Sequence, residues 1–229
     1  MTPTPGQRLE GIVKGEWVRA WIKEKRLGSD AQLRLTSNID DEVASSVFRA
    51  IKEKVVEPTG RGSFILPGHT GKAGIFWHGR RSDKPRRVYF AYEGLLTVAA
   101  AGDLHHLGWS ATEMRFEVIK GAFDLGVFDE RSGRLLIACE AKTKVRDVGS
   151  LVTQIEQCGR RGPHAKAGCP RAKTGHPKYE GLISSTPELL WVVAPGDRRL
   201  FSVTSLGRGF LGLVPVADTE LMRKPKKQV

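Results

Sequence analysis

Two carboxylates and a lysine lie in adjoining apolar segments, where charged residues are unusual. Asp124 falls within FDLGVF (123–128), and Glu140 and Lys142 fall at the end of LLIACEAK (135–142). Carboxylate oxygens are hard ligands of the kind that Mg²⁺ and Mn²⁺ prefer, and such an ion lowers the pKa of a bound water. Together with a lysine that can stabilise an attacking hydroxide, this set of residues is suited to hydrolysis of a phosphodiester bond.

The two segments are joined by Asp129–Gly133, whose residues favour a turn, so we expect an antiparallel hairpin. If Phe128 lies opposite Leu136, the same register puts Asp124 opposite Glu140, with both side chains on one face. Like charges directly across a ladder repel each other. This arrangement therefore requires a cation between the carboxylates or a face that is open to water.

A cation between these carboxylates would be Mg²⁺ or Mn²⁺, held by Asp124, Glu140 and the backbone carbonyl of Ala141. Lys142 continues on the same face, and the alternate residues of the second strand point to the other face and into the core. The alternative is a solvated sheet face with incidental charges. These residues alone leave both interpretations open.

Elements on both sides must position this hairpin. Residues 91–109, rich in Leu and Ala and closed by a Gly, predict a helix, and 111–121 alternate as a strand. After the hairpin, 148–161 carry apolar residues on one face and predict a second helix. Two further strands, 189–196 and 200–205, complete the expected sheet.

In the order of these elements, residues 90–160 resemble the PD-(D/E)xK nucleases, the restriction-endonuclease-like superfamily. The family pattern is a helix with a Glu, a strand, a strand with an Asp, a strand with Glu-x-Lys, and a helix that often carries a Gln. The matching residues are Glu93 in AYEGLL, Asp124 in FDLG, Glu140 and Lys142 in CEAK, and Gln154 in LVTQIEQ.

The resemblance implies a role for each of these residues. Asp124 and Glu140 would bind the metal, and Lys142 would position the nucleophile. Glu93 would bind metal-linked water or a second ion, and Gln154 would complete the catalytic set. The alternative for Glu93 is an ordinary exposed acid on a helix.

The chain departs from the family pattern at two places. Phe123 rather than Pro precedes Asp124, which leaves the ligand itself unchanged. Cys158 stands where a Tyr often follows the Gln by four positions.

The N-terminal part carries helical patterns at 1–28 and 39–56, followed by a Gly- and Pro-rich segment at 57–74 that predicts a loop or irregular β-structure. We therefore expect an α/β protein with a central mixed β-sheet flanked by helices and a mostly helical N-terminal extension. The resemblance implies that the sheet belongs to a restriction-endonuclease-like core. The expected domains are an extension at 1–85 with a DNA-binding or packing role, a nuclease core at 86–215, and a basic flexible tail at 216–229.

A basic segment follows the second predicted helix. Beside a nuclease site such residues would contact phosphates, which positions the backbone without reading its sequence, whereas a solvated basic face is the alternative. The residues expected to bind nucleic acid are Arg160, Arg161, Lys166, Arg171, Lys173 and Lys178.

The same segment contains Cys158, His164, Cys169 and His176, which are residue types that bind zinc. Their spacing matches no familiar zinc finger, and Cys158 completes the apolar face of its helix. We therefore expect a core cysteine beside a basic loop rather than a zinc site.

Composition limits the partners. The 229 residues include 37 Lys and Arg against 25 Asp and Glu, and the net charge of +12 favours a polyanion such as nucleic acid. No apolar run approaches the ~20 residues of a spanning helix, and the first residues lack the order of a signal peptide, so we expect a cytoplasmic protein without a membrane partner. Three cysteines suit a reducing compartment.

The function that these observations favour is an Mg²⁺-dependent nuclease that hydrolyses phosphodiester bonds, of DNA before RNA. The sequence does not distinguish an endonuclease from an exonuclease. It is also compatible with a homodimer. Two alternatives come from other classes. One is a catalytically silent nucleic-acid-binding module of the same fold, and the other is a zinc-stabilised interaction protein.

Overall fold

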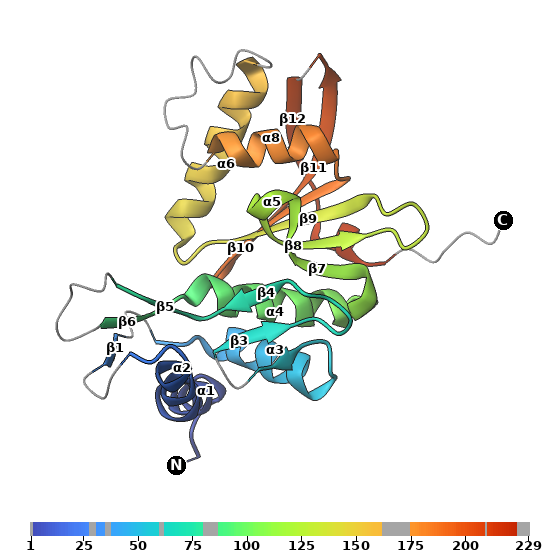
Figure 1. Cartoon of the computed structure of the whole chain (residues 1–229). Coiled ribbons are helices and arrows are strands. Elements are labelled where there is room, and N and C mark those ends of the chain that lie inside the picture. Colours follow the sequence, from blue (N-terminus) through green and yellow to red (C-terminus); the bar gives the residue numbers. More distant parts are fainter. Residues whose placement is uncertain are drawn as a thin grey trace. The chain divides into compact units, whose positions relative to one another are not determined.

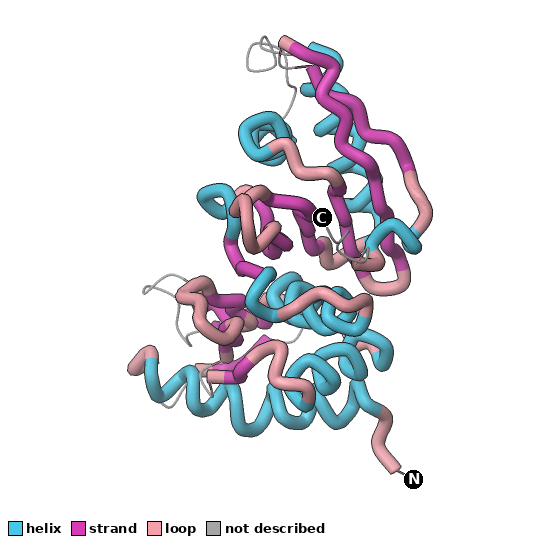
Figure 2. Tube along the Cα trace, turned by 90° about the vertical axis from the view of Figure 1, so that its right-hand side faces the viewer, coloured by secondary structure: helices cyan, strands magenta, loops and turns pink. Residues whose placement is uncertain are grey.

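The computed structural model describes residues 2–27, 31–34, 38–59, 62–79, 87–161, 175–208 and 210–223. The chain forms two compact units, Met1–Asp103 and Leu104–Val229. Helix α4 (Tyr92–His106) contains the division between them. Both units contain helices and strands, and a short loop leads from the N-terminus into the first helix (Figures 1 and 2).

The N-terminal unit begins with three consecutive helical segments, as its sequence pattern predicts. These are α1 (Pro5–Ile12), a π-helical turn η1 (Val13–Trp17) and α2 (Val18–Glu24). Thr4 begins α1 with a capping box, in which its hydroxyl accepts from the backbone of Gln7. Helix α3 (Asp41–Lys52) is the predicted amphipathic helix.

Two small sheets complete the N-terminal unit. Strands β2 (Glu57–Pro58), β3 (Ser63–Ile65) and β4 (Lys72–Gly74) form an antiparallel sheet within the segment predicted to be irregular β-structure. The second sheet has the order β1-β6-β5, with β1 parallel to β6 and β5 antiparallel to it. Its strands are β1 (Gln32–Arg34), β5 (Phe76–His78) and β6 (Arg87–Phe90).

The C-terminal unit is built on a six-stranded mixed sheet with the order β12-β11-β10-β9-β8-β7 (Figure 1). Neighbouring strands are antiparallel except β9 and β10, which are parallel. The strands are β7 (Met114–Glu117), β8 (Phe123–Phe128), β9 (Leu135–Ala141), β10 (Leu189–Ala194), β11 (Asp197–Gly207) and β12 (Phe210–Pro215). The predicted mixed α/β architecture with a mixed sheet is confirmed.

Helices α6 (Val145–Arg161) and α8 (Gly175–Ser185) pack with this sheet in one hydrophobic cluster. Helix α6 contributes an apolar face, which includes Leu151, Ile155 and Cys158. The strands contribute Ala138 from β9 and Leu190 from β10, among others. Cys158 is fully buried in this cluster, as its place on the apolar face predicts.

Two segments of the C-terminal unit differ from their predicted structure. The strand predicted over 111–121 is limited to β7, because a 3-10 turn η2 (Ala111–Glu113) precedes it and a short helical turn α5 (Val118–Gly121) follows it. The basic segment after α6 was expected to be a loop. In the structure its last part forms helix α8.

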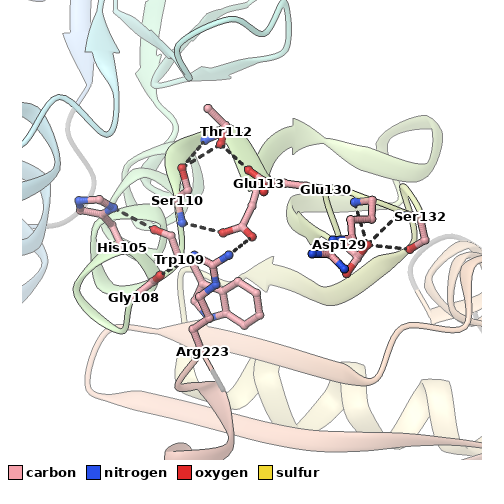
Figure 3. A network of polar contacts seen from close by, with 11 residues as sticks. His105, Gly108, Trp109, Ser110, Thr112, Glu113, Asp129, Glu130, Ser132 and Arg223 are labelled. Atoms are coloured by element: carbon pink, nitrogen blue, oxygen red, sulfur yellow. Dashed lines mark hydrogen bonds and ion pairs between the residues drawn. The ribbon is translucent and has the colours of Figure 1, made fainter. Parts of the chain in front are cut away.

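Part of the segment expected to be a flexible tail is structured. A 3-10 turn η4 (Asp218–Leu221) is anchored by Trp109, whose indole N–H donates to the carbonyl of Leu221 at 2.7 Å. Arg223 donates to the buried carboxylate of Glu113 at 2.7 Å, as Figure 3 shows. Residues 224–229 lie outside the described residues.

Candidate functional site

The β8–β9 hairpin brings the two predicted carboxylates together at its open end. Gly126 pairs with Ala138 as predicted, and the same register leads to Asp124 beside Glu140. The side chain of Asp124 is fixed by the neighbouring strand, because its Oδ2 accepts from the backbone N–H of Ala141 at 2.8 Å.

One detail of the predicted register is wrong. A β-bulge between Val127 and Phe128 places Phe128 opposite Leu135 rather than Leu136. A bulge adds one residue to one strand and so shifts the pairs on its far side only. Because this bulge lies towards the turn, the pairing near Asp124 is unaffected.

Glu140 is the buried centre of the site, with a side chain that is 3% exposed. A buried carboxylate is stable only when it is paired or hydrogen-bonded. Its Oε1 accepts from Lys142 Nζ at 2.6 Å, and its Oε2 accepts from Lys178 Nζ at 2.5 Å. The positive charge that the opposed carboxylates require is thus supplied here by two ammonium groups.

The face that carries Glu140 is a core face. Val192 of β10 lies beside Glu140 in the sheet and belongs to the hydrophobic cluster formed with α6 and α8. The other face, with Ile137 and Cys139, is also buried, as predicted. The interpretation of the charged face as a solvated sheet surface is therefore wrong for Glu140.

Lys142 lies between two of the predicted ligand atoms. Besides its contact with Glu140, its Nζ donates to the carbonyl oxygen of Ala141 at 3.0 Å. The side chain is 19% exposed, so the ammonium keeps some access to solvent while it contacts the buried carboxylate. A charged group in this position can act on an anion that approaches from solvent.

Lys178 is the second lysine of the site, and its expected phosphate contact stays a prediction. In the structure it extends from α8 to Glu140, with Nζ also 5.6 Å from the centre of the Phe123 ring. Tyr179 and Leu182 are three residues apart, which is a helical spacing, and both are buried. This spacing is the pattern in the sequence that indicates an apolar helix face next to Lys178.

Burial raises the pKa of Glu140 to about 7, and the nearby charge of Asp124 acts in the same direction. Lys142 and Lys178 oppose this shift by stabilising the ionised form. Desolvation and the charge of Asp124 together outweigh the effect of the two lysines. Glu140 is therefore a carboxyl group that can change its protonation state near neutral pH.

The other two residues of the family pattern stay predictions. Gln154 lies in α6, where its side-chain amide donates to Ser150 Oγ at 3.1 Å, one turn earlier in the same helix. Glu93 is exposed in the first turn of α4 and belongs to the N-terminal unit. The contacts described above bring together Asp124, Glu140, Ala141, Lys142 and Lys178.

The remaining basic residues are only partly described. Arg160 and Arg161 are exposed in the last turn of α6, and Arg160 lies 3.7 Å from Glu156. The other predicted phosphate contacts, Lys166, Arg171 and Lys173, lie outside the described residues.

The four candidate zinc ligands are also only partly described. Cys158 and His176 are both buried. His164 and Cys169 lie outside the described residues, so the expectation that no zinc is bound there stays a prediction.

The oxygen atoms at Asp124, Glu140 and Ala141 fit a divalent cation. All three are hard oxygen ligands. The oxygen atoms of Glu140 and Ala141 already accept hydrogen bonds from the same cation, the ammonium of Lys142. Within the described part of the chain, no three His, Cys, Asp or Glu side chains are grouped as ligands. Two carboxylates, a carbonyl and water are a sufficient set for Mg²⁺, which keeps several of its waters in proteins.

Comparison of the chain with protein families, with curated proteins and with solved structures gave no significant match. Among the described residues, no helix is long and apolar enough to cross a membrane.

Proposed function

We propose that the chain is a metal-dependent nuclease of the PD-(D/E)xK type that acts on DNA in preference to RNA. The observation that carries the proposal is the buried carboxylate of Glu140, held beside Asp124 and joined to Lys142. Burial of a carboxylate near a like charge costs stability, and such a cost is typical of functional sites.

The order of elements supports the finer assignment to a restriction-endonuclease-like core. Helix α4, strands β7, β8 and β9, and helix α6 follow one another as the family pattern requires. Asp124 lies in the second of these strands, and Glu140 lies in the third with Lys142 directly after it. The resemblance and the local geometry therefore both point to Asp124, Glu140 and Lys142.

Each residue has a distinct role in the proposed reaction. Asp124, Glu140 and the carbonyl of Ala141 would hold Mg²⁺ or Mn²⁺, which supplies a water of lowered pKa and neutralises charge on the phosphate. Lys142 orients the attacking hydroxide and stabilises the charge that develops on the phosphate. Lys178 holds Glu140 from the opposite oxygen and fixes the direction of that carboxylate.

The experiment compares cleavage of plasmid DNA by wild type, Glu140→Gln and Glu113→Gln, each with Mg²⁺ and with a chelator. Glu113 is a matched control, because its side chain is also 3% exposed and also paired with a cation, Arg223. We expect Mg²⁺-dependent cleavage that Glu140→Gln lowers by about a hundredfold or more, while Glu113→Gln cleaves normally. Equal activity in wild type and Glu140→Gln would refute the assignment.

One observation favours a second candidate, a catalytically silent nucleic-acid-binding module. Both oxygens of Glu140 are already paired with lysines, so the two carboxylate charges of the cluster are balanced by two ammonium charges without a metal. In that case the chain binds DNA equally well with Mg²⁺ and with a chelator. No cleavage is then detected at any Mg²⁺ or Mn²⁺ concentration.

A further inference from the structure

A row of side chains crosses the second sheet of the N-terminal unit on one face. In the register of β1-β6-β5, Tyr89 lies between Arg34 on one side and Trp77 on the other. Residues paired directly across a ladder point to the same face of the sheet. Arg87 lies on this face as well, because it is two residues from Tyr89 along β6.

The opposite face of this sheet is the one that packs into the unit. Phe76, Val88 and Phe90 are buried, and Trp21 of α2 packs against Phe76 at 5.8 Å between ring centres. This face therefore provides the contacts between the sheet and the hydrophobic core of the unit. Within the described part of the unit, the face with Trp77 and Tyr89 is less buried, since Trp77 and Arg87 are exposed.

The two aromatic rings on the open face are stacked on each other. Trp77 and Tyr89 have ring centres 4.2 Å apart and planes inclined by 15°, while the Trp77 side chain is 53% exposed. A tryptophan with so much exposed surface is unusual, and a stacked partner holds its ring in a fixed orientation. The result is a rigid aromatic surface that is accessible to a flat ligand.

The charged side chains of these three strands are positive. Arg34 and Arg87 are exposed on the same face, and none of the three strands contains an acidic residue. Guanidinium groups pair with phosphates, and aromatic rings stack with nucleobases. A surface with both groups matches a polymer in which bases and phosphates alternate.

We propose that this face of the β1-β6-β5 sheet, named here the Trp77 surface, binds single-stranded nucleic acid. The bases stack on Trp77 and Tyr89, and the phosphates contact Arg34 and Arg87. A duplex does not offer its base faces, so the Trp77 surface selects unpaired strands. This binding is independent of the proposed nuclease reaction and of its residues.

The test measures binding of a fluorescent single-stranded oligonucleotide of about 16 nucleotides by anisotropy, with a chelator present so that cleavage plays no part. Trp77→Ala should weaken binding about tenfold or more, because one stacking contact is lost. Trp77→Phe should keep most of the affinity. The matched control is Phe210→Ala, which removes an exposed aromatic ring of the other unit and should have no effect.

A second measurement needs no variant. An abasic strand has the same phosphates but no bases. The affinity of wild-type protein for this strand should be lower than its affinity for the normal strand by about tenfold or more. Duplex of the same sequence should bind equally well to wild type and to Trp77→Ala. Arg34→Ala and Arg87→Ala should each reduce the dependence of log affinity on log salt by about 0.7.

The proposal is overturned if the abasic strand binds as tightly as the normal strand, or if Trp77→Ala and Phe210→Ala have the same affinity. It is equally overturned if Trp77→Ala loses affinity for duplex as much as for single strands. Since these measurements contain no divalent metal, they can succeed when nuclease activity is absent and fail when it is present.

Discussion

At the residue scale, the two lysines that pair with Glu140 differ in position. Lys142 follows Glu140 in the same chain segment and also contacts the carbonyl of Ala141, whereas Lys178 reaches the carboxylate from α8. Only Lys142 touches two of the three proposed ligand groups. For the proposed nuclease we therefore expect Lys142 to act in catalysis and Lys178 to position Glu140.

This assignment predicts different results for two matched substitutions. Lys142→Met should lower the cleavage rate of bound DNA by about a hundredfold or more, because an interaction with the reacting phosphate is lost. Lys178→Met should lower the free energy of unfolding by about 1–3 kcal/mol, since it leaves a buried acceptor without one partner, and should retain most of the rate. Rates are measured in single turnover, and stability by denaturant unfolding. The reverse pattern would exchange the two roles.

The raised pKa of Glu140 predicts how stability depends on pH in the metal-free protein. Its pKa is about 7 in the folded chain against 4.5 for an ordinary glutamate. The folded state therefore binds this proton more tightly than the unfolded state. The resulting stabilisation is fully present below the unfolded value of 4.5 and is lost as pH rises through about 7.

The measurement is the melting temperature of chelator-treated protein from about pH 5 to about pH 8. It should fall over this range in wild type and fall less in Glu140→Gln, whose side chain stays neutral. Added Mg²⁺ should stabilise wild type more as pH rises, because the metal binds the ionised carboxylates. A parallel decline in both proteins would show that another group controls this pH dependence.

At the element scale, helix α6 approaches strand β12 at a glycine. A Cβ atom at Gly159 would lie 2.4 Å from the backbone oxygen of Leu211, whereas one at Gly149 of the same helix would meet only the side chain of Arg199, at 3.6 Å. The backbone oxygen cannot rotate away, so the helix or the strand would have to move. Gly159 therefore sets the distance between these elements.

Gly159→Ala should lower the free energy of unfolding by about 1–3 kcal/mol, because the added methyl group overpacks the contact with β12. Gly149→Ala is the control in the same helix, and should be neutral or stabilising by about 0.5–1 kcal/mol, since alanine favours helix more than glycine. Both are measured by denaturant unfolding. Similar stability of the two variants would mean that α6 and β12 separate easily.

The elements predicted from the sequence were those with clear periodicity. Helix α3 and the β8–β9 hairpin have apolar patterns of the expected period, and a cap or turn marks their ends. Helix α8 was missed because Gly175, Pro177 and Gly181 are typical of loops. In the structure Gly181 allows α8 to approach β8, since a Cβ atom there would lie 2.8 Å from the ring of Phe123.

At the scale of the whole molecule, the sequence predicted the part of the candidate site that is local in the chain. Asp124, Glu140 and Lys142 lie in one hairpin, so strand alternation and a turn are enough to bring them together. Lys178 lies 38 residues beyond Glu140, and its contact depends on the packing of α8 against the sheet. No local pattern contains that information, because it arises from tertiary packing.

The net charge of +12 belongs to the molecule rather than to any one site. Basic residues are present in both units, on the Trp77 surface of the first and at the end of α6 in the second. Attraction of a polyanion by such a charge is long-ranged and sensitive to salt. In the proposed function this attraction would bring nucleic acid to the protein, and the local chemistry of each surface would decide how it is bound or cleaved there.

The parallel pairing of β9 with β10 has a consequence for the order of folding. The β8–β9 hairpin closes over a short turn, but β10 can join β9 only after the crossover that contains α6 and α8 is in place. Closing the longer loop costs more entropy and is slower. Because the chain is synthesised from its N-terminus, Asp124 and Glu140 leave the ribosome before Lys178. The ion pair between Glu140 and Lys178 can form only after α8 has been synthesised and has packed against the sheet.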